Sequence, residues 1–450
     1  MKDKVAIITY DMIPNASSWG GCQRMYYLSK ELSINQYDVT VFSVKKNTNN
    51  DYGNKINFNI IQYSVKNKLL KNFIDSKNIV NTKANEKNLN GLNLIKKARR
   101  LIKDNKLLLN ILSKLDNYIF NEPTFLSGLI SRVWVNEYQA DIILYLKVHH
   151  FKKIIISVPS FGLLRIASFI KKEIPDSVII FDYRDPWNLW HQNSRKSLRQ
   201  EINFLNSADQ VVCTTDNLKQ DFASKLGVDI KKIKVISNGY SSQDWKEIQL
   251  AKTNNEKLII SYVGSIEIIH SGIRNVEKLM IAFKSFTDIH KNVLLRFIGV
   301  NDCNNTLIRQ YEALFGDKVE FHPVVSSYEA KKYMLESDAL LLLHTTEDAS
   351  GKYIISGKFY DYVRAGKIIF SISAIDSNHW KIIKSENLGL NSINDEKEIY
   401  DSLESLYTLW KNGNTKLTNT DIYRFSREFQ NQNYLKLLNS IEINKKVVQT

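Results

Sequence analysis

The stretch KIIISVPSFGLLRIASFIKKEIPDSVIIFDYRDPW, residues 153–187, decides the fold of this chain. Two nearly continuous apolar runs, KIIISVPS (153–160) and SVIIFDY (177–183), flank FGLLRIASFIKKEI (161–174), which has the pattern of a helix. Strands that are apolar at consecutive positions are buried on both faces, and such strands separated by helices form a parallel sheet. The stretch therefore predicts a strand, a helix and a second parallel strand of an α/β sheet.

The same alternation extends along most of the chain. Further predicted strands are KVAIITY (4–10), DVTVFSV (38–44), DIILYL (141–146), DQVVCTT (209–215) and IKVISNGY (233–240). The pattern restarts with KLIISYVGS (257–265), VLLRFIGV (293–300), VEFHPVV (319–325), DALLLLHT (338–345) and KIIFSIS (367–373). Two successive series of this kind predict an α/β fold with two Rossmann-like domains, each built on a parallel sheet.

The length of the chain supports more than one domain, because 450 residues exceed one ordinary core. We predict a first domain at 1–245, with a basic helical insertion at about 64–137. The second domain is predicted at 246–422, and the closing segment 423–450 is a helical pattern expected to cross back onto the first domain.

Composition excludes several classes of protein. Hydrophobic residues make up 43% and charged residues 24%, which is typical of a globular protein. Cys22, Cys213 and Cys303 are scattered and lack metal-ligand spacing, so neither a disulfide framework nor a zinc site is expected. No leader pattern and no apolar run of about 18 residues is visible, which favours a cytoplasmic location.

Positive charge is concentrated in one segment. The chain has a formal net charge of +15, and residues 64–116 contain 13 Lys and Arg against 4 acids, so 13 − 4 = +9. Within it, Leu92–Leu115 predicts a basic amphipathic helix that suits an anionic membrane surface, where the protein would be peripheral. The alternative is a solvated helix that packs on its own domain. Nucleic acid is not expected as a partner, because interleaved aromatic residues are absent.

Polar and glycine residues follow the predicted strands, at the edge where ligands bind in parallel sheets. In the first half these are Gly20 and Gly21, which open a helix, and Arg184 and Asp185. In the second half they are Gly264, Ser265, Arg274, Gly299, His344, Ser356, Gly357, Lys358 and Asp361. A lysine at a glycine-preceded helix start suits a diphosphate, and a carboxylate one turn later suits ribose hydroxyls.

Each of these features also has a structural interpretation. Gly20-Gly21 is equally a tight turn, and Arg184-Asp185 is equally an ion pair that pins its own loop. Trp187 suits stacking on a sugar, but packing beneath the loop explains it as well.

The order of these motifs, Gly-Gly, Arg-Asp-Pro-Trp, Asn-Gly-Tyr, Val-Gly and then Ser-Gly-Lys, resembles the GT-B glycosyltransferases of family 4. The resemblance is strongest to the bacterial surface-polysaccharide (capsule and lipopolysaccharide) branch with an Arg-Asp-Pro-Trp motif. It implies two Rossmann-like domains facing a central cleft, a nucleotide-sugar donor on the second, and a glycan or lipid-linked acceptor on the first. It also implies retention of anomeric configuration.

The chain departs from the family pattern at several positions. Asp361 stands where the family has the ribose-binding second glutamate of its Glu-x7-Glu pair, and Tyr353 stands at the first. Ser265 and Ser271 replace the usual arginine and lysine. Lys358 and Arg274 are then the candidates for binding the diphosphate.

Asp185 is the candidate catalytic carboxylate, which would orient an acceptor hydroxyl or accept its proton, with Arg184 as its organiser. No metal and no cofactor is expected, since Asp-x-Asp is absent from the sequence. Two alternatives remain open: a GT-B-like nucleotide-sugar epimerase, and a catalytically degenerate nucleotide-sugar-binding subunit.

Overall fold

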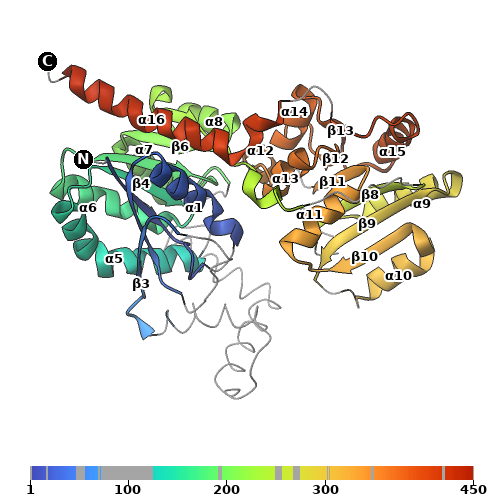
Figure 1. The fold of residues 1–450 in the computed structure, drawn as a ribbon, viewed down its shortest axis with the longest axis horizontal. Helices are drawn as coiled ribbons and strands as arrows, with labels where there is room; N and C mark the ends of the chain where they lie inside the picture. The colour runs from blue at the N-terminus through green and yellow to red at the C-terminus, as the bar shows by residue number, and fades with distance from the viewer. Residues whose placement is uncertain are drawn as a thin grey trace. The chain divides into compact units, whose positions relative to one another are not determined.

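The computed structural model describes residues 3–16, 19–46, 56–68, 71, 125–190, 195–248, 256–266, 274–301, 303, 305–345, 349–417 and 421–448. The chain divides into two compact units (Figure 1). Unit 1 comprises Met1–Ile236 and Asn433–Thr450, and unit 2 comprises Ser237–Gln432. The division after Ile236 precedes the boundary at 245 that the sequence predicts, and the chain returns to unit 1 within the predicted closing segment.

Unit 1 is built on a parallel sheet of seven strands in the order β3-β2-β1-β4-β5-β6-β7. The strands are β1 (Lys4–Thr9), β2 (Asp38–Val44), β3 (Asn59–Tyr63), β4 (Lys153–Val158), β5 (Val178–Tyr183), β6 (Gln210–Cys213) and β7 (Ile233–Val235). The strand order reverses between β1 and β4. In an open parallel sheet the crevice for a ligand lies at such a reversal, beyond the carboxyl ends of the strands.

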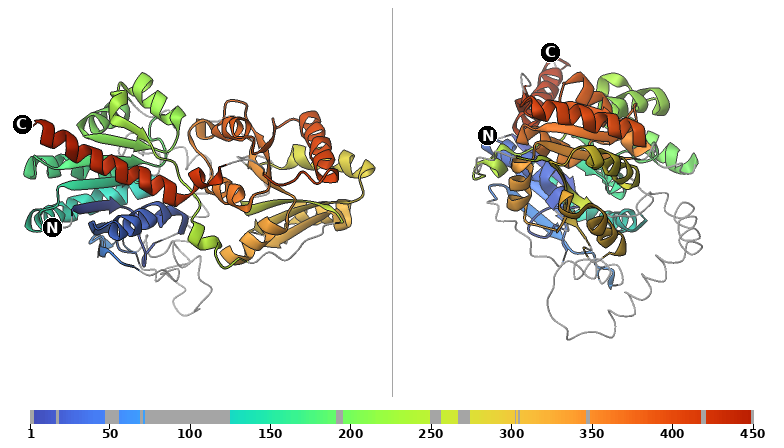
Figure 2. Two further views of the ribbon diagram at one scale, coloured as in Figure 1. Left: turned by 45° about the horizontal axis from the view of Figure 1, so that its top comes forward. Right: turned by 90° about the vertical axis from the view of Figure 1, so that its right-hand side faces the viewer.

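Helices cover both faces of this sheet (Figure 2). They are α1 (Trp19–Ile34), α5 (Phe125–Val148), η1 (Phe161–Arg165), α6 (Ile166–Glu173), α7 (Arg195–Ser207), α8 (Asp216–Leu226) and η2 (Ile230–Lys232). Helix α16 (Arg427–Val448) begins in unit 2 and continues along unit 1, where Tyr434, Leu437 and Leu438 join the core formed by α1 and the strands.

Helix α5 corrects one prediction, because DIILYL (141–146) lies in this helix and forms no strand. Its buried residues Ile130, Trp134, Tyr138, Ile142 and Leu146 recur every four positions. That spacing places them on one side of a helix. A short apolar run cannot by itself distinguish a buried helix segment from a strand.

Unit 2 is built on a second parallel sheet, in the order β10-β9-β8-β11-β12-β13. Its strands are β8 (Leu258–Ile266), β9 (Val293–Val300), β10 (Val319–Pro323), β11 (Ala339–His344), β12 (Ile368–Ser373) and β13 (Gly389–Ser392). Its helices are η3 (Ser242–Trp245), α9 (Glu277–Ile289), α10 (Thr306–Phe315), η4 (Gly316–Lys318), α11 (Ser327–Glu336), α12 (Ala349–Tyr353), α13 (Gly357–Ala365), α14 (Asn378–Ser385), α15 (Glu396–Lys411) and η5 (Ile422–Phe425). The strand order reverses between β8 and β11.

Strand β11 shows why the sequence of these strands is continuously apolar. Ala339, Leu341 and Leu343 pack into the core on one face of the sheet, and Leu340 and Leu342 pack into the core on the other. Successive side chains of a strand point to opposite faces, so a strand with both faces covered needs apolar residues at every position. The predicted α/β fold with two parallel-sheet domains is therefore confirmed.

Most of the basic insertion predicted at 64–137, including Leu92–Leu115, lies outside the described residues. Among the helices that the structure describes, none combines the length and the apolar character needed to cross a membrane.

Candidate functional site

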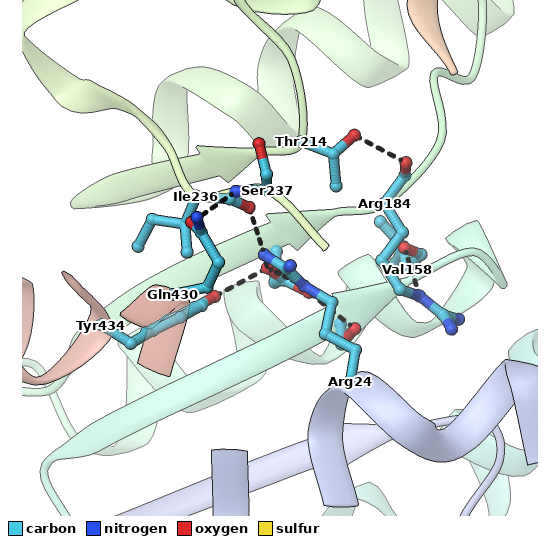
Figure 3. Close-up of polar contacts among 10 residues, drawn as sticks. Arg24, Val158, Arg184, Thr214, Ile236, Ser237, Gln430 and Tyr434 are labelled. Carbon is cyan, nitrogen blue, oxygen red and sulfur yellow. Dashed lines mark hydrogen bonds and ion pairs between the residues drawn. The ribbon is translucent and has the colours of Figure 1, made fainter. Parts of the chain in front are cut away.

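The three charged residues of FDYRDPW have three different environments in unit 1. Asp182 lies within β5 and is fully buried on the face covered by α1 and α16. Arg24 donates to both carboxylate oxygens, with its Nη2 at 2.8 Å, and Tyr434 donates its hydroxyl at 2.7 Å (Figure 3). Ser157 on the neighbouring strand completes the set at 3.0 Å.

These contacts keep Asp182 ionised. Burial opposes its ionisation, but the Arg24 guanidinium and the Tyr434 hydroxyl outweigh burial and hold the pKa of the Asp182 carboxyl below its ordinary value. Arg24 also donates to the Ile236 carbonyl at 2.8 Å. Asp182, Arg24 and Tyr434 therefore connect β5, α1 and α16, and Arg24 also connects them to the residue that follows β7. The role of this group is structural.

Arg184 is bound by backbone carbonyls. Its guanidinium donates to Val158 at 3.2 Å, to Pro159 at 2.9 Å and to Gly21 at 2.5 Å. No described hydrogen bond joins Arg184 to Asp185, because three of the five guanidinium N–H groups donate to these carbonyls and Arg184 acts on Asp185 only through its charge. Arg184 instead ties the end of β5 to β4 and to the start of α1.

Asp185 differs from Asp182 in that its carboxylate can still accept hydrogen bonds. It is partly buried, and no described residue forms a hydrogen bond to its side chain. Burial raises the pKa of the Asp185 carboxyl, and the nearby positive charge of Arg184 opposes that rise. A raised pKa and free acceptor capacity are properties that a general base requires.

Trp187 does not have the exposure that contact with a sugar requires. Its side chain is 1% exposed and is stacked on Phe161, with ring centroids 5.1 Å apart and planes 12° apart. Of the two interpretations of Trp187, stacking on a sugar and packing beneath the loop, the structure shows the second.

The carboxyl ends of β1 and β2 add an ion pair that the sequence analysis did not identify. Lys46, which follows β2, binds Asp11, which follows β1. Gly21, in the first turn of α1, accepts a hydrogen bond from Arg184 through its backbone carbonyl. Gly20 is exposed, and a Cβ added there would meet no neighbouring atom. Residues 20 and 21 thus lie at the predicted ligand edge.

In unit 2 the predicted cation Lys358 lies at the carboxyl end of β8. Its Nζ donates to the Tyr262 hydroxyl at 2.5 Å and lies over the Tyr262 ring, 3.9 Å from the centroid. A Cβ at Gly264 would lie 2.6 Å from this Nζ, and Gly264 has φ +141°, so only glycine fits there. The Lys358 amine therefore lies beside β8, at the place where the strand order of the sheet reverses.

The charge on Lys358 has no counter-ion among the described residues. None of their carboxylates forms an ion pair with it, and the charged group that acts on it is Arg274, which is also positive. Burial, followed by the charge on Arg274, lowers the pKa of the Lys358 ammonium to about 7. The two cations that the sequence predicts for a diphosphate therefore repel each other electrostatically.

Asp361 lies one turn into α13 and is partly buried. Trp245 donates its indole N–H to Asp361 Oδ1 at 3.3 Å, and burial raises the pKa of the Asp361 carboxyl. Its other oxygen has no hydrogen-bond partner among the described residues, which leaves capacity for a hydroxyl donor. Tyr353, at the position of the missing glutamate, is 2% exposed.

The start of α13 is held by a histidine that sequence reasoning missed. The Ser356 N–H, immediately before Gly357, donates to His379 Nε2 at 3.0 Å. Burial, then His344 and Lys358, lower the pKa of His379 to about 3, so the imidazole is neutral and accepts at Nε2. Asn378, the residue before His379, donates to the Lys352 carbonyl in α12 at 2.7 Å. The first turn of α14 therefore binds both α12 and the residue that precedes α13.

The remaining predicted residues of unit 2 are placed as follows. His344 ends β11, is 7% exposed and lies 5.7 Å from the His379 ring. Gly299 lies near the end of β9 with φ +104°. Ser265 belongs to β8, and Ser271 lies outside the described residues. Within the described ranges, no group of three or more His, Cys, Asp or Glu side chains could hold a metal ion.

No protein-family model matches the chain, and no curated protein matches it. Solved structures do. Sucrose-phosphate synthase from Thermosynechococcus elongatus is 13% identical, with a TM-score of 0.64, covering 98% of this chain and 100% of the other. HepE from Anabaena, solved with UDP and glucose, is 11% identical, with a TM-score of 0.57, covering 97% and 100%.

A protein from Listeria monocytogenes assigned as a UDP-N-acetylglucosamine 2-epimerase is 10% identical, with a TM-score of 0.54, covering 99% of this chain and 98% of the other. At such identities the likeness concerns the fold. The chain has the two-domain α/β architecture of these proteins, the GT-B fold.

Proposed function

We propose that this chain is a retaining, metal-independent glycosyltransferase of the family 4 type. It would move a sugar from a nucleotide-sugar donor to a glycan or lipid-linked acceptor of a bacterial cell surface, working in the cytoplasm and, through residues 64–116, at the membrane surface. The fold accommodates such an enzyme, and HepE, which shares it, was solved with UDP and glucose.

The observation that carries the proposal is the environment of Lys358. A lysine amine is held at the reversal point of a parallel sheet, beside a second cation, with no carboxylate partner among the described residues. Lys358 has no carboxylate partner among the described residues and is repelled by the charge of Arg274, and a bound anion removes that cost. A diphosphate supplies that anion, and positive charge also stabilises it as a leaving group.

The other residues then take complementary roles. Asp361 would accept hydrogen bonds from ribose hydroxyls through its unoccupied oxygen. Ser356, Gly357 and Gly264 would let the backbone approach the phosphates, and His344 and Gly299 would line the same edge. In unit 1, Asp185 would orient or deprotonate the acceptor hydroxyl, with the departing diphosphate as the other proton acceptor.

A nucleotide-sugar epimerase is the second candidate, because the assigned Listeria epimerase has the same fold. The experiment incubates the wild type with a panel of nucleotide sugars, with and without a bacterial lipid extract as acceptor. A transferase releases nucleoside diphosphate only when acceptor is present, whereas an epimerase converts the donor sugar without it. Binding without either product indicates a degenerate subunit and contradicts the proposal.

The matched variant is Asp185→Asn, which keeps the size of the side chain and removes its basicity. Transfer should fall by at least about a hundredfold, the scale of a positioned general base, with the donor dissociation constant unchanged. A nearly normal turnover would show that Asp185 serves only its own loop.

A further inference from the structure

Glu201, on helix α7, holds the loop that carries Asp185. The glutamate is fully buried, and its Oε2 accepts from the Asn188 backbone N–H at 3.0 Å and from Asn188 Nδ2 at 2.8 Å. The Trp187 backbone also hydrogen-bonds this carboxyl. One carboxylate oxygen thus collects the donors of two successive loop residues directly after Asp185 and Pro186.

The loop is anchored on both sides of Asp185. On the amino side, the Arg184 guanidinium is fixed by the Val158, Pro159 and Gly21 carbonyls. On the carboxyl side, Trp187 is stacked in the core and Asn188 is bound to Glu201. Asp185 lies between these anchors, and its own side chain forms no hydrogen bond to a described residue. The contacts therefore fix the backbone and leave this carboxylate free.

A buried acid is a costly way to anchor a loop. Three buried polar atoms have no hydrogen-bond partner among the described residues: Glu201 Oε1, Asn188 Oδ1 and the Tyr183 hydroxyl. Burial and then the charge of Glu201 raise the pKa of the Tyr183 phenol, so Glu201 acts electrostatically on Tyr183. Unsatisfied buried groups destabilise a fold and are tolerated where function requires them.

We propose that Glu201 is a positioning residue for the transfer step: by binding Trp187 and Asn188 it sets where the Asp185 carboxylate stands at the carboxyl edge of the sheet. This inference rests on the proposed function of Asp185. Glu201 makes no contact with substrate in this role and acts only through the loop.

The test compares Glu201→Leu, which removes the acceptor, with Glu201→Gln, whose amide oxygen can accept the same hydrogen bonds. Misplacing a reacting group by about 1 Å costs about a hundredfold in rate, so Glu201→Leu should lower kcat by that order. The dissociation constant of the donor, which binds unit 2, should not change. Glu201→Gln should restore most of kcat. Asn203→Leu, at an exposed position of the same helix, is the control and should match the wild type.

Wild-type kcat in Glu201→Leu would overturn the proposal, and so would a Glu201→Gln variant as impaired as Glu201→Leu. If Glu201→Leu does not fold, Asn188→Ala replaces it, since it removes one of these hydrogen bonds from the loop side; kcat should fall about tenfold, and an unchanged kcat overturns the proposal. Loss of transfer in Asp185→Asn with full activity in Glu201→Leu rejects the positioning role alone. Full transfer in Asp185→Asn rejects the proposed function itself.

Discussion

Raising the pH from 7 to 9 should weaken the binding of a nucleoside diphosphate about fiftyfold, because Lys358 loses its charge in that range. The pKa of its ammonium lies at about 7 in the unliganded protein. About half of the Lys358 side chains are then charged at pH 7, about a tenth at pH 8 and about a hundredth at pH 9. If the diphosphate binds only the ammonium form, the dissociation constant rises in proportion as the charged fraction falls.

The direction follows from the charge states. The ligand is anionic and favours the protonated lysine, so affinity is greatest below pH 7 and is lost as the pH rises through 7. The terminal phosphate of a nucleoside diphosphate ionises near pH 6, below the range used. Tyr262 and His379 do not titrate in this range: burial, opposed by Arg274, raises the pKa of Tyr262 to about 12, and the pKa of His379 lies at about 3.

Isothermal titration with UDP and GDP, in two buffers of different ionisation enthalpy, measures both the affinity and the protons taken up. At pH 8 about 0.9 proton should be taken up per diphosphate bound. Lys358→Arg is the control, since a guanidinium stays charged throughout, and its dissociation constant should be flat between pH 7 and 9. A flat wild-type curve, or a slope that persists in Lys358→Arg, would refute the reasoning.

Three further predictions concern residues whose roles follow from their contacts. Asp182→Asn leaves Arg24 buried without its counter-ion and should lower the free energy of unfolding by about 3–5 kcal/mol in denaturant titrations. The neighbouring Asp185→Asn should change it by under about 1 kcal/mol, and equal losses would contradict the distinction between the two acids. Burial raises the pKa of Glu201 to about 7, above its value of 4.5 in the unfolded chain, so the wild type should lose about 3 kcal/mol relative to Glu201→Gln as the pH rises from 4.5 to 7. A constant difference between the two melting curves over this range would exclude that shift. His379→Leu removes the acceptor for the Ser356 N–H and should weaken nucleoside diphosphate binding about tenfold, whereas His379→Gln should weaken it less; equal affinities in both variants would argue against the role of His379 at the start of α13.

The sequence predicts the strands that are buried on both faces and also the edge strands β7 and β10, but it misses the edge strands β3 and β13. Strands such as β5 and β11 need apolar residues at every position, which makes them visible. Strands β3 (NIIQY) and β13 (GLNS) close their sheets at the edges and are only partly buried, so they carry no continuous apolar run. DIILYL is wrongly predicted as a strand because a run of five apolar residues does not reveal the four-residue repeat of the longer helix around it.

The sequence predicts those residues of the candidate site that can be identified from their position next to a strand or helix. Gly264 and Lys358 were identified from their places after a strand and before a helix, and the structure brings them together. Asp182 and Arg24, by contrast, are 158 positions apart, and no local pattern shows that they pair. Glu201 gave no signal as an anchor, although its spacing of four residues from the buried Leu205 places it on the inner face of α7.

The central claim is that unit 2 binds a nucleotide sugar through Lys358, and that Asp185 in unit 1 acts on transfer alone. Thermal unfolding of the wild type, Lys358→Met and Asp185→Asn against a panel of nucleoside diphosphates and nucleotide sugars tests it most directly. At about a hundred times the dissociation constant, a ligand of this site should stabilise the wild type and Asp185→Asn by about 2.7 kcal/mol, and Lys358→Met by much less. Stabilisation of the wild type by no member of the panel, or equal stabilisation of Lys358→Met, would contradict the account.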